Sequence, residues 1–216
     1  MPWKSAKYDQ VSNEMKPGDV IAFAGHGPVS EIIMRTTQSN VSHVGVILQP
    51  RPAPGEPQGE ILQVIESTSL DGCVGVTISR LSERIQSYDG KVWWLPLRDS
   101  VRERMDPKEF RQFLLQQEGK PYDVPQAIMS GLDQLDDHTL LERATRAVED
   151  FSKFFCSELV AAAFEASGAI SHLNASEVTP IDLCTFSIYK QDYCQLKGEK
   201  ALIEGYNTLS AEGWGE

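Results

Sequence analysis

Cys156 opens the segment of this chain that is best suited to chemistry. It follows an apolar stretch, and apolar side chains recur behind it at three- and four-residue spacing, which predicts a helix over 156–167 that Gly168 ends. In the first turn of a helix, free backbone N–H groups and the positive end of the helix dipole favour a thiolate. Cys156 is therefore a candidate nucleophile, although a small buried core cysteine is the simpler interpretation of this segment alone.

A nucleophilic cysteine needs a neighbouring base, and the base needs a partner that orients it. Among the 4 histidines, His43 is the strongest candidate, because it begins a predicted strand over 43–48 and Gly45 leaves room beside it. The alternative is a structural histidine at a strand end. His26 lies in a Gly-His-Gly turn, where we expect a flexible turn residue that could line a pocket.

Glu66 is the candidate orienting group. It follows the apolar pair Val64-Ile65 in a predicted strand over 61–67. If this strand lies antiparallel to the one that begins at His43, the carboxylate can accept a hydrogen bond from the imidazole and support its cationic form. Taken alone, Glu66 is better explained as a solvent-facing residue at a strand end.

Four motifs follow one another in an order that resembles a known family. They are Ser-His-Val-Gly-Val at 42–46, Ile-Glu at 65–66, Gly-Lys-Pro-Tyr-Asp at 119–123 and Phe-Cys-Ser-Glu-Leu-Val at 155–160. This order resembles that of the permuted NlpC-type papain-like cysteine hydrolases, in which the histidine precedes the cysteine helix. The YiiX-like branch is the most similar, and lecithin retinol acyltransferase is a more distant relative. The resemblance runs over residues 16–183.

The resemblance implies an α+β, circularly permuted papain-like fold, with a small antiparallel sheet packed against the cysteine-bearing helix and additional helices around it. It also implies roles for the residues. Cys156 would be the nucleophile, His43 the general base and Glu66 the orienting residue. Tyr122 resembles a family tyrosine near the cleft, whose hydroxyl would hold an oxyanion together with the backbone N–H of Cys156. The alternative for Tyr122 is a packed loop aromatic with a solvated hydroxyl.

The function that these residues favour is a cysteine hydrolase, of peptidase or amidase type, that cleaves an amide, thioester or ester bond through an acyl-enzyme. We assign no cofactor to it, and the acyl substrate could be a peptide, a lipid or a small molecule. Three alternatives stay open: an acyltransferase that acts on lipid or another acceptor, a catalytically inactive binding module, and a metal site formed by the same three side chains.

Composition limits the partners. The chain has 216 residues and a net charge of −11, which argues against binding to nucleic acid or to anionic lipid. The first 19 residues are polar, without the apolar core of a secretion signal, and no apolar stretch is long enough to cross a membrane, so we expect a cytoplasmic protein. None of the 4 cysteines are spaced as Cys-x-x-Cys. Disulfide pairing and oligomeric state stay open.

The length predicts one catalytic domain over 1–216, with a core over 16–183, a helical insertion over 123–152 and a mobile tail over 205–216. Strands are expected at 20–24, 43–48, 61–67, 74–81, 91–97 and 186–196, and helices at 30–37, 107–118, 125–132, 140–151 and 156–167, with a capped turn at 179–183. Strands followed by helices indicate an α+β fold with an antiparallel sheet.

Overall fold

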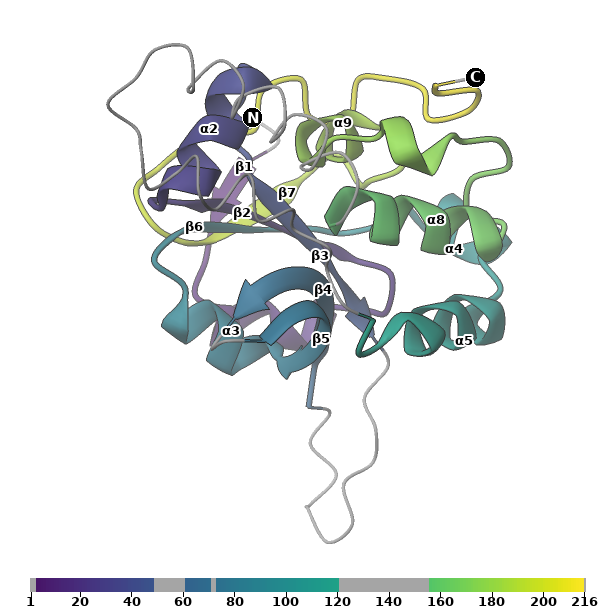
Figure 1. The fold of residues 1–216 in the computed structure, drawn as a ribbon, viewed down its shortest axis with the longest axis horizontal. Coiled ribbons are helices and arrows are strands. Elements are labelled where there is room, and N and C mark those ends of the chain that lie inside the picture. The colour runs from purple at the N-terminus through teal and green to yellow at the C-terminus, as the bar shows by residue number, and fades with distance from the viewer. Residues whose placement is uncertain (1–2, 49–60, 71–72, 121–155, 216) are drawn as a thin grey trace, which may run out of the picture.

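The computed structural model describes residues 3–48, 61–70, 73–120 and 156–215. Within these ranges one sheet of seven strands runs in the order β1-β7-β6-β2-β3-β4-β5 (Figure 1). The strands are β1 (Trp3–Ser5), β2 (Val20–Gly25), β3 (His43–Leu48), β4 (Gln63–Leu70), β5 (Cys73–Arg80), β6 (Gly90–Leu95) and β7 (Tyr193–Lys197). β1 and β7 are parallel, and the other neighbouring pairs are antiparallel.

Helices pack around this sheet. Those described are α1 (Tyr8–Val11), η1 (Ser12–Glu14), α2 (Pro28–Thr36), α3 (Leu81–Ser87), α4 (Asp99–Arg104), α5 (Pro107–Gln117), α8 (Glu158–Ala166), η3 (Ala175–Glu177) and α9 (Pro180–Thr185). In Figure 1, α5 and α8 lie together on the right-hand side, and α3 lies at the lower left. The α+β class expected from the sequence is confirmed. None of these helices is long and apolar enough to cross a membrane.

Alternation along the strands divides the core into two clusters. In β2, Ala22 belongs to the cluster that also contains α5 and α8, whereas Phe23 belongs to the cluster that contains Leu81 of α3. Trp93 and Trp94 are split in the same way, as expected for consecutive residues of a strand. Both faces of the sheet are therefore buried at its centre.

The helix predicted after Cys156 is present as α8. The apolar face of α8 is buried. The ring of Phe164 stacks on that of Phe110 of α5, with the centroids 6.1 Å apart and an angle of 17° between the planes. Cys156 and Ser157 form a helical turn directly before Glu158, and Gly168, at φ 74°, follows the last turn. A glycine suits this left-handed position because it has no Cβ to clash with the backbone.

β3 and β4 separate at the end that carries His43. Their pairing joins Val46 to Ile65 and Leu48 to Gln63, and the same register would place Val44 opposite Ser67. The described pairing stops at Val46, while β4 continues to pair with β5 as far as Leu70. The start of β3 therefore has an N–H edge that does not bond to β4, and this edge is available to another group.

Several elements differ from the sequence-based expectation. α3 and α4 were not predicted, and α2 begins at Pro28 instead of residue 30, with Gly27 as its N-cap. The last strand is confined to Tyr193–Lys197 and lies inside the sheet between β1 and β6, so the sheet is larger than expected and the core extends past residue 183. The insertion expected at 123–152 lies outside the described residues.

The C-terminal segment packs against the core, in contrast to the mobile tail expected from its composition. Tyr206 and Ala211 are buried, and the ring of Trp214 contacts Phe186 edge-on with centroids 5.3 Å apart. The N–H of Ser187 donates to the carbonyl of Leu209 at 2.6 Å. Glycine and polar residues in this segment therefore form turns around buried aromatic anchors.

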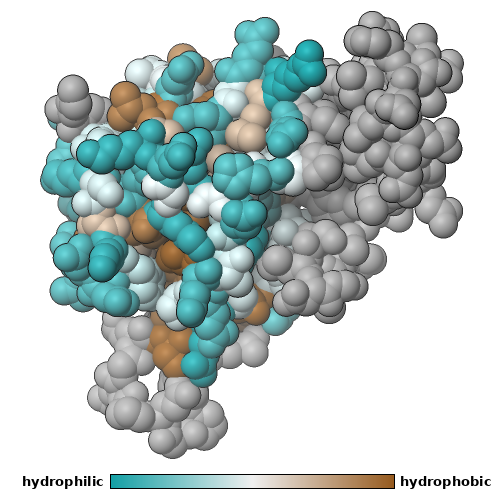
Figure 2. Space-filling model, turned by 90° about the vertical axis from the view of Figure 1, so that its left-hand side faces the viewer, coloured by the Kyte–Doolittle hydropathy of each residue, from teal (hydrophilic) through white to brown (hydrophobic). Residues whose placement is uncertain are grey.

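One face of the molecule is shown in space-filling form in Figure 2. Hydrophilic residues predominate on it, and hydrophobic residues form small, separate patches. Among the described residues, Leu202 and Leu209 are the large hydrophobic side chains that are exposed. Isolated apolar residues of this kind are ordinary on a protein surface, and we assign them no function.

The N-cap of α5 offers a test of the fold. The Asp106 carboxylate accepts hydrogen bonds from the N–H groups of Lys108 and Glu109 at 2.8 and 3.0 Å. We expect Asp106→Ala to lower the free energy of unfolding by about 1 kcal/mol, because these N–H groups lose their acceptor. Urea denaturation checks this. Asp106→Asn keeps an acceptor and should lose much less, and an equal loss in both variants would contradict the capping role.

Candidate active site

His43 and Glu66 form the buried centre of the site. The His43 Nε2 atom lies 2.6 Å from Oε2 of Glu66, and the Glu66 side chain is 0% exposed. Because an ionised carboxylate can only accept hydrogen bonds, Nε2 carries the proton and donates it. The Nδ1 atom is then the ring nitrogen that remains for a second partner. The sequence-based pairing of these two residues therefore agrees with the geometry.

Gly45 allows this contact. The β3–β4 register places Gly45 next to Glu66, and a Cβ at Gly45 would lie 2.8 Å from Cγ2 of Val64 and 3.2 Å from Cβ of Glu66. A side chain at position 45 would therefore occupy the space that Glu66 uses to reach His43. The room that the sequence analysis expected beside Gly45 is taken by the neighbouring strand.

Cys156 meets His43 at the open start of β3. The two side chains are close enough to couple electrostatically, and the backbone N–H groups of Val44 and Ser157 are near enough to stabilise negative charge on the Cys156 sulfur. Val44 lies beyond the described pairing of β3 with β4, so its N–H can face the thiol instead of a partner on β4. Cys156 is 6% exposed, so these contacts lie in a largely dry environment.

Charge couples the thiol and the imidazole. Burial alone would raise the pKa of the Cys156 thiol, but the adjacent His43 imidazolium and the hydrogen bonds to sulfur hold that pKa below its ordinary value. Burial alone would lower the pKa of His43, but Cys156 and Glu66 together raise it to about 9. Between these two pKa values the pair is a thiolate and an imidazolium.

Ser157 anchors the turn that holds the nucleophile. Its hydroxyl is buried and donates to the carbonyl oxygen of Val178, which follows η3, at 2.5 Å. The bond joins the first turn before α8 to a segment beyond the end of that helix. Ser157 therefore helps to fix the turn that carries Cys156.

Arg84 and Tyr88 are parts of the site that the sequence analysis missed. Nε of Arg84 donates to Oε1 of Glu66 at 2.6 Å, and Nη2 donates to Oε2 at 3.0 Å. The Tyr88 ring packs against the Arg84 guanidinium, 4.8 Å from centroid to Cζ, and burial raises the pKa of its hydroxyl to about 12. A signal existed: Leu81, Arg84, Ile85 and Tyr88 recur at helical spacing, so Arg84 lies on the apolar stripe of α3.

The other two predicted site residues are not brought to this centre. Tyr122 lies outside the described residues. His26 is exposed on the turn between β2 and α2, and no interaction among the described residues joins it to Cys156, His43 or Glu66. The three cysteines Cys156, Cys184 and Cys194 are free thiols. No group of three or more His, Cys, Asp or Glu side chains in the described ranges is arranged to hold a metal ion.

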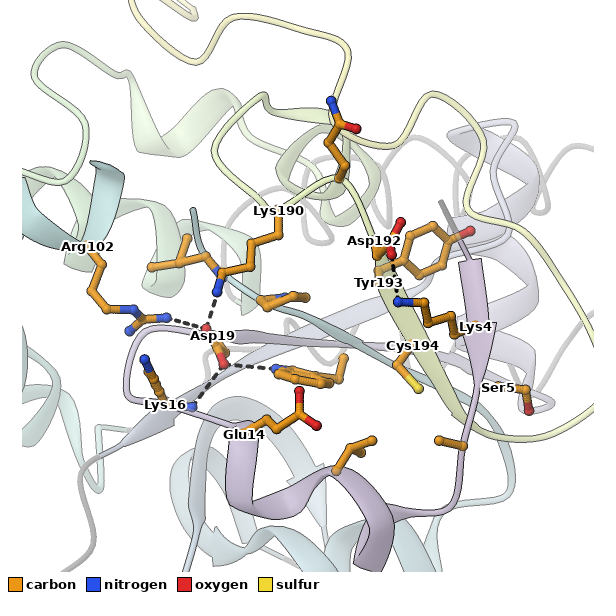
Figure 3. Close-up of a pocket in the computed structure, with 16 residues that line it drawn as sticks. Lys4, Ser5, Glu14, Lys16, Asp19, Arg102, Lys190, Asp192, Tyr193 and Cys194 are labelled. Carbon is orange, nitrogen blue, oxygen red and sulfur yellow. Dashed lines mark hydrogen bonds and ion pairs between the residues drawn. The ribbon is translucent and has the colours of Figure 1, made fainter. Parts of the chain in front are cut away.

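A cavity of about 920 Å³ lies elsewhere, between the segment from β1 to η1 and the strands β6 and β7 (Figure 3). Asp19 is buried at its wall, where it accepts from Nε1 of Trp94 at 2.9 Å and from the guanidinium of Arg102. Burial raises the pKa of Asp19, and Arg102 opposes that rise. Cys156, His43 and Glu66 do not line this cavity, which is separate from the candidate site.

No family model matches the chain, and no curated protein matches it. Among solved structures, it is similar to a crystal structure described as metalloprotein yiiX from Escherichia coli O157:H7, DUF1105. The sequence identity is 20% and the TM-score is 0.43, and the match covers 86% of this chain and 98% of that one. At this level the likeness does not bear on chemistry, so the interpretation of the site rests on its own geometry.

The close approach at Gly45 gives a second prediction. In Gly45→Ala the new Cβ would lie 3.1 Å from the carbonyl oxygen of Ile65 and closer still to Val64. We expect the free energy of unfolding to fall by about 1–3 kcal/mol, because the strands must move apart. Urea denaturation measures it. Gly27→Ala has nothing within 4 Å of its new Cβ and serves as the control. Equal losses would contradict the crowding at Gly45.

Proposed function

We propose that this protein is a cysteine hydrolase that cleaves an amide, thioester or ester bond through an acyl-enzyme on Cys156. The observation that carries the proposal is the placement of Cys156 beside His43, whose ring is hydrogen-bonded to the buried Glu66 carboxylate. A nucleophile, a base and an orienting carboxylate in this order form the arrangement that covalent acyl transfer requires. The permuted NlpC-type fold that the motifs resemble is part of the same proposal.

In the first half of the reaction, the Cys156 thiolate attacks the carbonyl carbon of the substrate and forms a carbon–sulfur bond. The carbonyl electrons move to oxygen, and when the tetrahedral intermediate collapses the bond to the leaving group breaks. His43 gives its Nδ1 proton to that leaving group. The acyl group is then held as a thioester, and His43 is neutral.

In the second half, neutral His43 takes a proton from water, and the resulting hydroxide attacks the thioester carbonyl. Collapse of the second intermediate breaks the carbon–sulfur bond, releases the carboxylic acid and restores the thiolate–imidazolium pair. Glu66 holds the ring so that Nδ1 faces the sulfur in both halves. The backbone N–H of Cys156 and the hydroxyl of Tyr122 are our proposed donors to the oxyanion.

The charge coupling predicts the pH dependence of thiol reactivity. Because His43 lowers the pKa of Cys156, we expect the rate of alkylation by iodoacetamide to rise and level off below the pH at which an ordinary thiol, with a pKa of about 8.5, would react. In His43→Ala the imidazolium is lost and burial still raises the pKa of the thiol, so the rate should rise only at or above that ordinary value. Stopped-flow measurement across the pH range checks both.

Cys184 gives the control for that experiment. It is a buried free thiol, and burial raises its pKa well above the ordinary range. Cys184→Ala should leave the low-pH reaction intact, whereas Cys156→Ala should remove it. If the wild-type profile follows an ordinary thiol and does not change in His43→Ala, the activated pair does not exist and the proposed function is wrong.

The acyl-enzyme gives a direct prediction. Deacylation depends on neutral His43 as the base. With a strong acyl donor, His43→Gln should therefore slow deacylation more than it slows acylation. Incubation with cell extract followed by intact-mass analysis should show an added mass on Cys156, and fragmentation of that adduct identifies the acyl group. Equal labelling of Cys156→Ala would favour a binding module without catalytic chemistry.

A further inference from the structure

The carboxylate of Glu66 is shared between two cations. His43 binds one oxygen from β3, and Arg84 binds both oxygens from α3 in a fork, at 2.6 and 3.0 Å. Planar guanidinium and carboxylate groups bind each other in this way with defined geometry. The Glu66 side chain therefore cannot rotate away from His43 without breaking both bonds to Arg84.

Arg84 is itself held in place. Its side chain is 6% exposed, and its guanidinium lies over the rings of Phe23 and Tyr88, at 5.0 and 4.8 Å from their centroids. The ring of Phe23 also lies 5.4 Å from the His43 ring, so the aromatic side chains that surround Arg84 reach the base as well. Leu81 and Ile85 bury the same face of α3, which fixes the helix that carries the guanidinium.

Four charges meet in this buried space. The Cys156 thiolate and the Glu66 carboxylate are negative, and the His43 imidazolium and the Arg84 guanidinium are positive, so the set has no net charge. Without Arg84 the three remaining groups would have a net charge of minus one in a space that is shielded from water. A buried uncompensated charge is costly, and the set would relieve it by binding a proton.

We propose that Arg84 is a positioning residue of the site, which clamps Glu66 against His43 and neutralises the set when Cys156 is a thiolate. The inference rests on the proposed function and deepens it, because it assigns to α3 the control of the nucleophile's charge. Arg84 acts through Glu66 and does not touch the sulfur.

Among the residues that the structure describes, two other titratable groups face the set. Tyr88 packs against Arg84 and lies within electrostatic range of both Glu66 and Cys156, and burial raises its pKa to about 12. Cys184, on α9, lies within electrostatic range of Cys156, and burial raises the pKa of the Cys184 thiol well above its ordinary value. Both groups stay neutral below pH 9, so they add no charge over the range in which the pair is tested.

The test uses the full chain with Arg84→Met and Arg84→Lys. In Arg84→Met the loss of a positive charge raises the proton affinity of the remaining groups, so the rise of the alkylation rate should move up by about one pH unit. Arg84→Lys keeps the charge, and its profile should stay near the wild-type position. If Arg84→Met does not fold, the lysine variant still tests the clamp by the second measurement below.

Proton NMR detects the hydrogen bond between His43 and Glu66 directly. The short Nε2–H bond from His43 to Glu66 should give a far-downfield proton signal, which His43→Ala identifies by its disappearance. A lysine ammonium is a point charge and cannot bind both carboxylate oxygens in a fixed fork. The signal should therefore move upfield or broaden in Arg84→Lys, and do so further in Arg84→Met.

Arg102→Met is the matched control, because Arg102 also lies on a helix and binds a buried carboxylate, Asp19, away from the site. Arg102→Met should lower the free energy of unfolding but leave the pH profile of alkylation and the downfield proton signal unchanged. A wild-type profile and an unmoved signal in the Arg84 variants would overturn the role of Arg84 but leave the proposed function standing. An ordinary thiol profile in the wild type would instead overturn the proposed function.

Discussion

Glu66 carries its negative charge where water does not reach, and the geometry of the site depends on how that charge is satisfied. A buried carboxylate is stable only when donors surround it. Burial would raise its pKa, but His43 and Arg84 together keep the pKa below its ordinary value. Two other features support the buried carboxylate. Gly45 leaves the space that the Glu66 side chain occupies, and the apolar stripe of α3 positions Arg84 beside it.

The separation of β3 from β4 is the second requirement. A continuous ladder would use the Val44 N–H for pairing and would leave no donor for a sulfur atom at that place. Because the strands are not paired on the His43 side of Val46, the sulfur can approach the edge of the sheet and lie near that N–H. The thiol is thus bound by backbone donors that would otherwise be unsatisfied.

Much of this arrangement could be predicted from the sequence, and the physical reasons for the failures are specific. Periodicity predicted β2, β3 and α8 because each is a single apolar pattern bounded by turn residues. His43 and Glu66 could be paired because an antiparallel neighbour brings them together. Arg84 was missed because a charged residue is expected at the surface. Its position on a buried stripe shows only when α3 is recognised, and that helix follows β5 without a turn residue.

Composition also misled at the C-terminus. Glycines and polar residues suggested a solvated tail, yet Tyr206 and Trp214 anchor the segment to the core. Each of them packs on a ring that is distant in the sequence, Trp214 on Phe186 and Tyr206 on Tyr189, so neither belongs to a local periodic pattern. A contact between distant single residues cannot be inferred from local sequence, and the position of β7 inside the sheet was missed for the same reason.

The short length of α3 has a consequence for thermal behaviour. The helix spans Leu81–Ser87, and it carries Arg84 on less than two full turns. Helices this short have little stability of their own and depend on packing. Local opening of α3 would withdraw the guanidinium while the sheet remains folded. The site would then lose its reactivity through a sub-global transition, at a temperature below that at which the protein melts.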